Sequence, residues 1–199
     1  MDHAAVLNAP QESSELMGTA RGKIGMWLFL VSDALTFGAL LCAYGAIRMG
    51  YSDWPVPSQV LDVPLTAFNT FVLVCSSLTM VKALSAIRHG DVKGLKKFLL
   101  FTALGGVLFL SIQAYEYHHL LFVENLRLRN NLFCATFFAL TSFHGAHVLS
   151  GVIYLFVIRH LAGKGHFTAE NNHRVEVAGL YWHFVDLVWI LVFTFVYLV

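Results

Sequence analysis

The stretch that decides the fold is VAGLYWHFVDLVWILVFTFVYLV, residues Val177 to Val199. A helix of about 23 residues is long enough to cross a hydrocarbon layer of roughly 30 Å. Asp186 lies near its middle, and placing an ionised carboxylate in lipid costs from about 2.5 to more than 10 kcal/mol. Asp186 must therefore face protein or water and be partnered, or else stay protonated.

Helical spacing predicts which side chains surround this carboxyl group. Trp182, Asp186 and Trp189 are separated by four and three residues, so they fall on one stripe of the helix. His183 is three residues from Asp186 and is therefore its close neighbour. We expect the stripe to be a packed inner face.

The composition indicates a membrane protein. Of 199 residues, 57% are hydrophobic and 13% are charged, against roughly 25% charged in soluble domains. Five separate apolar runs of more than 20 residues predict an all-α, polytopic bundle of five transmembrane helices. Nucleic acid is not an expected partner, because the sequence has no continuous basic stripe. Cys42, Cys75 and Cys134 lie within apolar runs and are expected to be small buried side chains.

The chain divides into a polar segment, residues 1–22, and a single transmembrane domain, residues 23–199. Pro64 suits the first turn of the second helix, since proline is favoured there. The sequence shows no cleavable signal peptide, second domain or internal repeat. The predicted spans are about 24–47, 65–87, 98–120, 131–158 and 177–199.

The basic residues predict the orientation. With a cytoplasmic N-terminus, ten of the thirteen Lys and Arg residues fall inside, and only Arg48, Arg127 and Arg129 fall outside. Five spans then place the C-terminus outside. The ten inner residues are Arg21, Lys23, Lys82, Arg88, Lys93, Lys96, Lys97, Arg159, Lys164 and Arg174.

Counting the helical rise from the inner helix ends predicts two polar layers in the membrane. Asp33 and Asp186 both lie about 13 Å deep, so they share a layer. The first layer is a buried set of carboxyl and imidazole groups, comprising Asp33, His147, His183 and Asp186. The second lies about 21 to 27 Å deep, toward the outer face, and comprises Gln113, Glu116 and His144.

Three interpretations of these groups follow from the residues alone. A metal or haem site would use His144 and His147, three residues apart, but the paired Glu-x-x-His motifs of a di-iron bundle are missing. A proton relay is a second possibility, because intramembrane carboxyl groups often mark proton paths. In the third, the polar residues only link helices. The basic turn with Arg88, Lys93, Lys96 and Lys97 is a topology signal and a candidate site for anionic lipid headgroups.

Four stretches resemble subunit III of the haem-copper terminal oxidases. Gly179 to Tyr197 contains YWHFVD followed by VW, close to the last helix of that family. SFHGAHVLSGVIYL, Ser142 to Leu155, is similar to its HG-x-HV helix, and IQAYEYHHL, Ile112 to Leu120, to its Q-x-x-EY segment. GMWLFLVSDALTF, Gly25 to Phe37, is similar to the helix in which an acidic residue follows a serine.

The resemblance implies a non-catalytic subunit with no metal of its own, the haem and copper being held by partner subunits. It implies direct contact with subunit I, association with subunit II and possibly small subunits or a supercomplex, and phospholipid bound in a cleft between the first two helices and the remaining three. Such a subunit supports oxygen reduction to water coupled to proton translocation. Asp33 takes the place of the family's buried carboxyl group, and Glu116, His144 and His147 that of its inner polar set. Glu176, Trp182, His183 and Asp186 take the places of the final helix, and Glu176 and Trp182 join the headgroup candidates.

Two departures leave the electron donor open. Many cytochrome c oxidase members carry Glu where this chain has Asp33, and Asp is more similar to the quinol-oxidising branch. The two extra N-terminal helices of mitochondrial members are missing, which implies the bacterial five-helix form in a plasma membrane. The alternatives are a quinol oxidase subunit or a homologue associated with nitric oxide reductase, and outside the family a proton-coupled transporter or a metal-dependent membrane enzyme.

Overall fold

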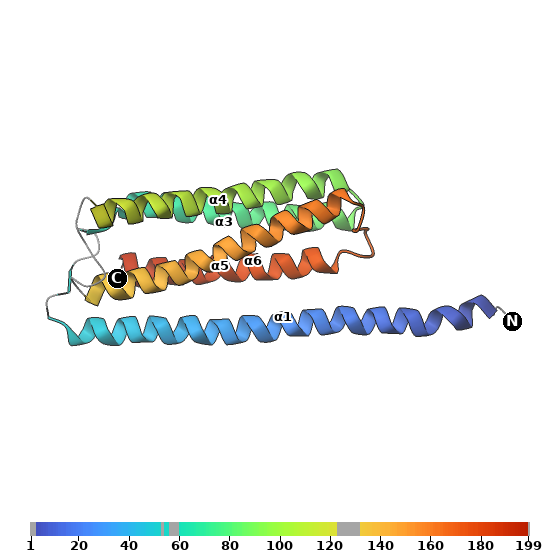
Figure 1. Cartoon of the computed structure of the whole chain (residues 1–199), viewed down its shortest axis with the longest axis horizontal. Helices are drawn as coiled ribbons and strands as arrows, with labels where there is room; N and C mark the ends of the chain where they lie inside the picture. Colours follow the sequence, from blue (N-terminus) through green and yellow to red (C-terminus); the bar gives the residue numbers. More distant parts are fainter. Residues whose placement is uncertain (1–2, 53, 56–59, 123–131, 199) are drawn as a thin grey trace.

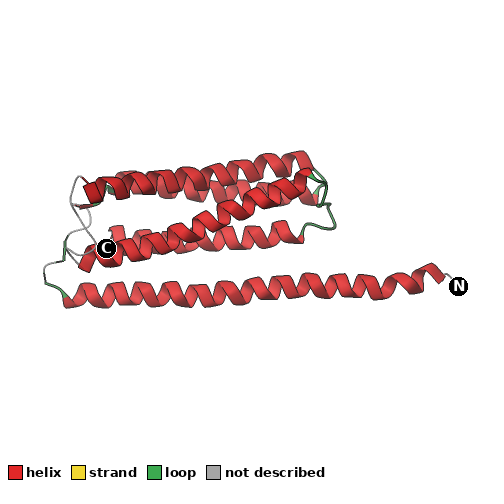
Figure 2. Cartoon of the chain, in the orientation of Figure 1, coloured by secondary structure: helices red, strands yellow, loops and turns green. Residues whose placement is uncertain are grey.

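The computed structural model describes residues 3–52, 54–55, 60–122 and 132–198, with side chains from Arg21 onward. The predicted outer loop with Arg127 and Arg129 lies outside the described residues. Within them the chain is entirely helical apart from short turns (Figure 2). The elements are α1 (His3–Gly50), α3 (Val63–Arg88), α4 (Val92–Phe122), α5 (Leu132–Gly163), α6 (His173–Val192) and a closing π-helical turn, η1 (Phe193–Leu198).

Five helices in the described part of the chain are long and apolar enough to cross a membrane, which confirms the predicted fold class. Their membrane-spanning parts are Arg21–Gly50, Val63–Arg88, Val92–Phe122, Leu132–Gly163 and His173–Leu198. The first begins within a longer helix. At 1.5 Å per residue α1 is about 72 Å long, and its N-terminal part extends past the other helices (Figure 1). The polar segment before the first span is therefore helical from His3 onward.

The helices alternate in direction, so the N-terminus, the α3–α4 turn and the α5–α6 connection lie at one end of the bundle (Figure 1). The most extensive contact joins α3 to α4, and α6 packs against α3, α5 and α1. The expectation that a lipid cleft separates the first two helices from the remaining three is wrong for this chain. Its second span, α3, packs along α4 and α6, and α1 alone lies on the opposite side, against α5 and α6.

Short-range contacts explain where α3 and α4 begin. Asp62 caps α3 by accepting a hydrogen bond from the backbone N–H of Leu65 at 3.1 Å, and Pro64 lies in the first turn, as predicted. Gly90 has a φ of 75°, which allows the chain to reverse tightly after α3. Asp91 Oδ1 then accepts from the N–H of Gly94 at 2.8 Å. The tight turn brings α3 and α4 together as an antiparallel pair.

The predicted stripe on α6 is a packed inner face. Trp182 is 1% exposed, Asp186 5% and Trp189 0%. Both indole N–H groups donate to hydroxyl groups of α3, Trp182 to Ser76 at 3.0 Å and Trp189 to Thr70 at 2.9 Å. Because each indole is both buried and hydrogen-bonded, the stripe fixes α6 against α3.

Glycines make room for these rings. A Cβ on Gly106 would lie 2.6 Å from the Trp182 ring and from Val152, and one on Gly151 would lie 3.0 Å from the same ring. A Cβ on Gly105 would meet Ser76 at 2.7 Å. The helices are therefore closely packed at these three positions. At Gly145 the nearest atom would be 3.9 Å from an added Cβ, which is an ordinary van der Waals distance.

The cysteines follow the prediction only in part. Cys134 is buried, whereas Cys42 and Cys75 are exposed on the surface of the chain. An apolar helix in a membrane places similar residues on its lipid-facing and protein-facing sides, so an apolar run by itself does not indicate burial within the protein.

Replacing Gly106 with leucine tests the packing of α6. The added side chain meets both Trp182 and Val152, and overpacking of this kind costs about 1–3 kcal/mol. We expect a lower midpoint of thermal unfolding in detergent and a reduced yield of assembled complex. Gly38→Leu is the control, because a Cβ there meets nothing within 4 Å. Equal midpoints for the two variants would contradict the proposed packing.

Candidate functional site

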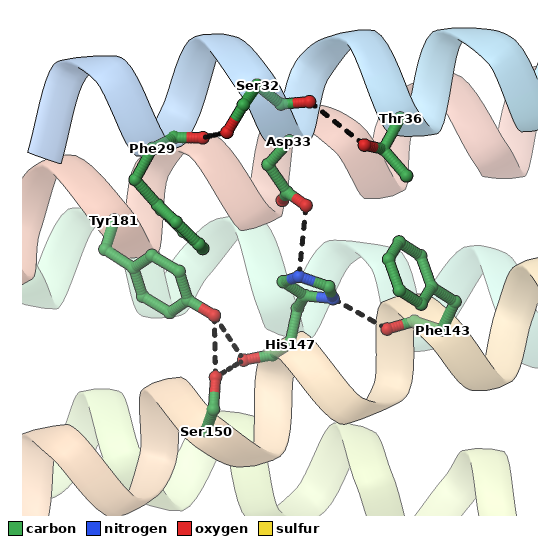
Figure 3. A network of polar contacts seen from close by, with 8 residues as sticks. All are labelled: Phe29, Ser32, Asp33, Thr36, Phe143, His147, Ser150 and Tyr181. Atoms are coloured by element: carbon green, nitrogen blue, oxygen red, sulfur yellow. Dashed lines mark hydrogen bonds and ion pairs between the residues drawn. The ribbon is translucent and has the colours of Figure 1, made fainter.

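The central polar contact of the α1 side joins Asp33 to His147 of α5. Oδ1 of Asp33 lies 3.3 Å from Nε2 of His147 (Figure 3). Asp33 is 8% exposed, and its second oxygen, Oδ2, has no hydrogen-bond partner among the described residues. A polar pair in this position links α1 to the rest of the bundle where lipid offers no other partner.

His147 is held in place from two sides. Its Nδ1 lies 2.8 Å from the carbonyl oxygen of Phe143. Its own carbonyl accepts from Tyr181 at 3.1 Å and from Ser150 at 2.8 Å, and these two hydroxyl groups lie 2.6 Å apart (Figure 3). The contact with Phe143 orients the imidazole toward Asp33, and the contact with Tyr181 ties the backbone of His147 to α6.

This geometry allows two positions for one proton. A carbonyl oxygen only accepts, so Nδ1 of His147 carries a hydrogen and donates it to Phe143. The proton between the two side chains is then either on Asp33, donating to Nε2, or on Nε2, donating to the carboxylate. Both arrangements keep the hydrogen bond, and the pair is neutral overall in each.

The other half of the predicted inner layer has different partners. Nδ1 of His183 shares a hydrogen bond with the hydroxyl group of Ser77 on α3. Asp186 is buried next to Ser77, but neither of its carboxyl oxygens has a hydrogen-bond partner among the described residues. The structure thus brings Asp33 and His147 together, and it joins His183 to α3 instead of to that pair.

In the predicted outer set, Gln113 and Glu116 meet and His144 does not join them. Glu116 Oε2 accepts from Tyr197 at 2.9 Å and from Gln113 at 3.4 Å, and its Oε1 from Thr66 at 3.1 Å. These bonds connect η1, α4 and α3.

His144 is fully buried among aromatic rings. Its ring stacks on Trp189 at 4.8 Å and meets the edges of Phe109 at 5.7 Å and Phe37 at 6.4 Å. Neither ring nitrogen has a hydrogen-bond partner among the described residues. The position of His144 along α5 predicts its depth in the membrane but not the direction in which its side chain points.

The basic end of the bundle holds a second contact of α1. Lys23 Nζ lies 2.8 Å from Glu176 Oε2, and Arg88 lies 3.8 Å from Oε1, so α1, α6 and α3 meet at Glu176. Of the other headgroup candidates, Lys93 and Lys97 are exposed and Lys96 is half-buried. Trp182 is buried in the core, where it is remote from any headgroup.

An apolar groove of about 370 Å³ runs between α1 and α6. On α1 it is lined by Trp27, Leu30, Val31 and Ala34, and on α6 by Leu180, His183, Phe184 and Leu187. Its walls are side chains that match hydrocarbon, with the His183 ring as the one polar member of the lining. The groove lies on the side of the bundle where α1 stands apart from α3 and α4.

The histidines and carboxyl groups described above do not gather into a metal-binding group. Among the described residues, no three His, Cys, Asp or Glu side chains are grouped so that they could hold an ion.

Sequence reasoning missed the partners that complete these contacts. They are hydroxyl groups, and one of them, Tyr197, lies on the same face of the last helix as Trp189. Hydroxyl residues are common in membrane helices and show no spacing that would identify them. The missed residues are Thr66, Ser77, Ser150, Tyr181 and Tyr197.

The fold and the contacts together define a five-helix membrane subunit whose ionisable side chains link helices within the bundle. Comparison with known proteins identifies the kind of subunit. The sequence profile of the family described as cytochrome c oxidase subunit III matches residues 14–199.

Several relatives are also named as third subunits of respiratory oxidases. Cytochrome c oxidase subunit 3 of Thermostichus vulcanus is 36% identical over 176 residues, covering 88% of this chain and 86% of the relative. The subunit 3 of Synechocystis is 40% identical, covering 87% and 74%. Subunit 3 of the cytochrome bo(3) ubiquinol oxidase of Pseudomonas putida is 33% identical, covering 88% and 84%. The chain belongs to the cytochrome c oxidase subunit III family, whose members are non-catalytic subunits of haem-copper oxidases.

A double-mutant cycle tests the Asp33–His147 contact. Asp33→Leu and His147→Leu each leave one buried polar side chain without its partner, whereas the double variant removes both side chains. We expect a coupling energy of about 0.5–3 kcal/mol in the free energy of unfolding, measured with denaturant in micelles.

Asp33→Leu combined with Thr102→Val serves as the control, because Thr102 pairs with Thr79 between α3 and α4. These two changes should add within about 0.5 kcal/mol. Additivity of Asp33→Leu with His147→Leu would show that the contact does not stabilise the bundle.

Proposed function

We propose that this chain is subunit III of a bacterial respiratory oxidase, in which it supports oxygen reduction to water coupled to proton translocation. It is a multi-pass protein of the plasma membrane, with a cytoplasmic segment, residues 1–22, before its transmembrane domain. The haem and copper belong to partner subunits. Family membership supports this assignment.

The orientation we propose has the N-terminus in the cytoplasm and the C-terminus outside. Lys23, Arg88, Lys93 and Lys97 all belong to the end of the bundle that holds the α3–α4 turn. Short loops rich in Lys and Arg face the cytoplasm in most membrane proteins, which supports this direction.

Cytochrome c is the electron donor that we propose for the complex. The relatives from Thermostichus, Synechocystis and Alkalihalophilus are named as cytochrome c oxidase subunits, at 33–40% identity. The ubiquinol oxidase relatives, at 29–33% identity, are the second candidate. Oxygen uptake by the purified complex with reduced cytochrome c, compared with uptake with a quinol, decides between them.

Direct contact with subunit I, and association with subunit II and with small subunits or a supercomplex, belong to the same proposal. Large apolar side chains remain exposed on every helix, including Phe29, Phe71, Phe101, Phe156 and Phe195. In a membrane these surfaces face either lipid or the helices of other subunits.

The groove between α1 and α6 is the proposed place for phospholipid. Its walls are apolar, and it lies next to the end of the bundle where Lys23, Arg88 and Glu176 meet. The apolar groove can hold an acyl chain of the phospholipid, while the phosphate of its headgroup lies near the basic side chains. This position replaces the cleft that the family resemblance implied between other helices.

Filling the groove should release lipid. Ala34→Phe projects from α1 into the groove, and we expect less phospholipid to copurify with the complex, measured by mass spectrometry of an organic extract. Ala43→Phe is the matched control, since Ala43 is exposed on the same helix but does not line the groove. Equal lipid content in the two variants would contradict binding in this groove.

We propose that the Asp33–His147 pair is the functional centre of this subunit, because it holds α1 beside the groove and stores one shared proton. Asp33→Asn leaves a side chain that cannot exchange that proton with His147. We expect normal initial oxygen uptake, since the redox centres are elsewhere, followed by earlier inactivation during sustained turnover. Complete loss of initial activity in an intact complex would contradict a supporting role.

A further inference from the structure

A pocket of about 110 Å³ opens at the end of the bundle opposite Lys23, and the proposed function does not use it. Its polar lining consists of Asp62 at the start of α3 and Glu116 and His119 near the end of α4. Val60, Leu65 and Leu120 supply apolar walls, and Tyr115 completes the lining. A cavity of this size with several polar groups is large enough to hold water.

Glu116 is the buried member of this lining. It is only 5% exposed, and it accepts hydrogen bonds from three elements, through Thr66 of α3, Gln113 of α4 and Tyr197 of η1. Glu116 therefore connects the wall of a polar pocket to the final turn of the chain.

Thr66 gives this site two equally complete hydrogen-bond arrangements. Its Oγ1 lies 3.1 Å from Glu116 Oε1 and 3.0 Å from the carbonyl oxygen of Asp62, yet a threonine has a single hydroxyl hydrogen. When Glu116 is ionised, Thr66 can donate to Oε1. When Oε1 carries a proton, Glu116 can donate to Thr66, which then donates to the Asp62 carbonyl. A proton can thus arrive or leave without stranding a polar group.

The final turn depends on the same carboxyl group. Tyr197 donates to Oε2, and a hydrogen bond to a carboxylate is about twice as strong as one to a neutral acceptor. The π-helical backbone of Phe193–Leu198 carries Tyr197 to this position. The charge on Glu116 accordingly changes how firmly η1 is held to α3 and α4.

We propose that Glu116 exchanges a proton with the aqueous phase at this end of the bundle, through the pocket, and that its charge controls the hold on the final turn. The proton passes from pocket water to Oε1, the carboxyl charge changes from −1 to 0, and no other bond is made or broken. The titratable groups that face Glu116 are Asp62 on α3, Tyr115, Tyr117 and His119 on α4, and Tyr197 on η1.

Asp186 provides an internal comparison. It is as buried as Glu116, at 5% exposure, but it lines neither this pocket nor the groove between α1 and α6, and its oxygens have no hydrogen-bond partner among the described residues. Any difference in proton exchange between the two carboxyl groups therefore reports on the pocket and on Thr66, and not on burial alone.

The test is infrared spectroscopy of the intact oxidase complex transferred into heavy water, repeated from mildly acidic to neutral pH. Carboxylic acid bands are assigned by their loss in Glu116→Gln and in Asp186→Asn. We expect the Glu116 band to shift on deuteration about tenfold faster than the Asp186 band, equivalent to about 1.4 kcal/mol in the barrier to exchange. We also expect Tyr197→Phe to change the frequency of the Glu116 band, because a donor is lost.

Four further variants test the route. Leu65→Trp fills the pocket and should slow exchange at Glu116 about tenfold, whereas Leu104→Trp, at an exposed position of α4 away from the pocket, should not. Thr66→Val should also slow exchange, and Thr66→Ser, which keeps the hydroxyl group, should restore it. A band that exchanges no faster than that of Asp186, or the lack of any Glu116 acid band across the pH range, would overturn the proposal. So would exchange that is unaffected by Leu65→Trp in a complex that assembles normally.

Discussion

The packing of Trp182 against two glycines is the contact on which the rest of the structure depends. A Cβ on Gly106 of α4 would collide with the indole ring, and one on Gly151 of α5 would lie only 3.0 Å from it. The ring also donates to Ser76 of α3. One side chain of α6 thus touches three helices, and its burial sets the distances at which α3, α4 and α5 surround α6. The positions of Tyr181, His183 and Asp186 on α6 follow from this placement.

Polar contacts then join the helices at defined heights. Lys23 with Glu176 and Asp33 with His147 attach α1 to the bundle, and Glu116 connects α3, α4 and the final turn. In lipid a polar side chain has few alternatives to a partner within the protein, so such contacts specify which helices adjoin. The same arrangement leaves an open apolar groove beside α1. The chain belongs to a family of non-catalytic oxidase subunits, and the supporting role that we propose for it agrees with this arrangement.

The sequence was sufficient to predict the five helices and the buried face of α6, because apolar length and helical spacing determine them. It also predicted that Asp33 and His147 lie at similar depth, and the two side chains are in contact. Depth does not determine rotation about the helix axis, however. His144 lies near the height of Glu116 but faces Trp189, and His183 meets Ser77. The cleft was misplaced for a related reason, since neither spacing nor family motifs indicated that the second span pairs with the third.

We propose that this chain contributes lipid contacts and packing to the oxidase but none of its redox centres. Selective removal of the chain from the purified complex, followed by measurement of haem and copper content and of oxygen uptake, tests this most directly. We predict unchanged metal content and retained initial uptake, with faster inactivation during turnover. Loss of haem or copper in proportion to the chain removed would contradict the account.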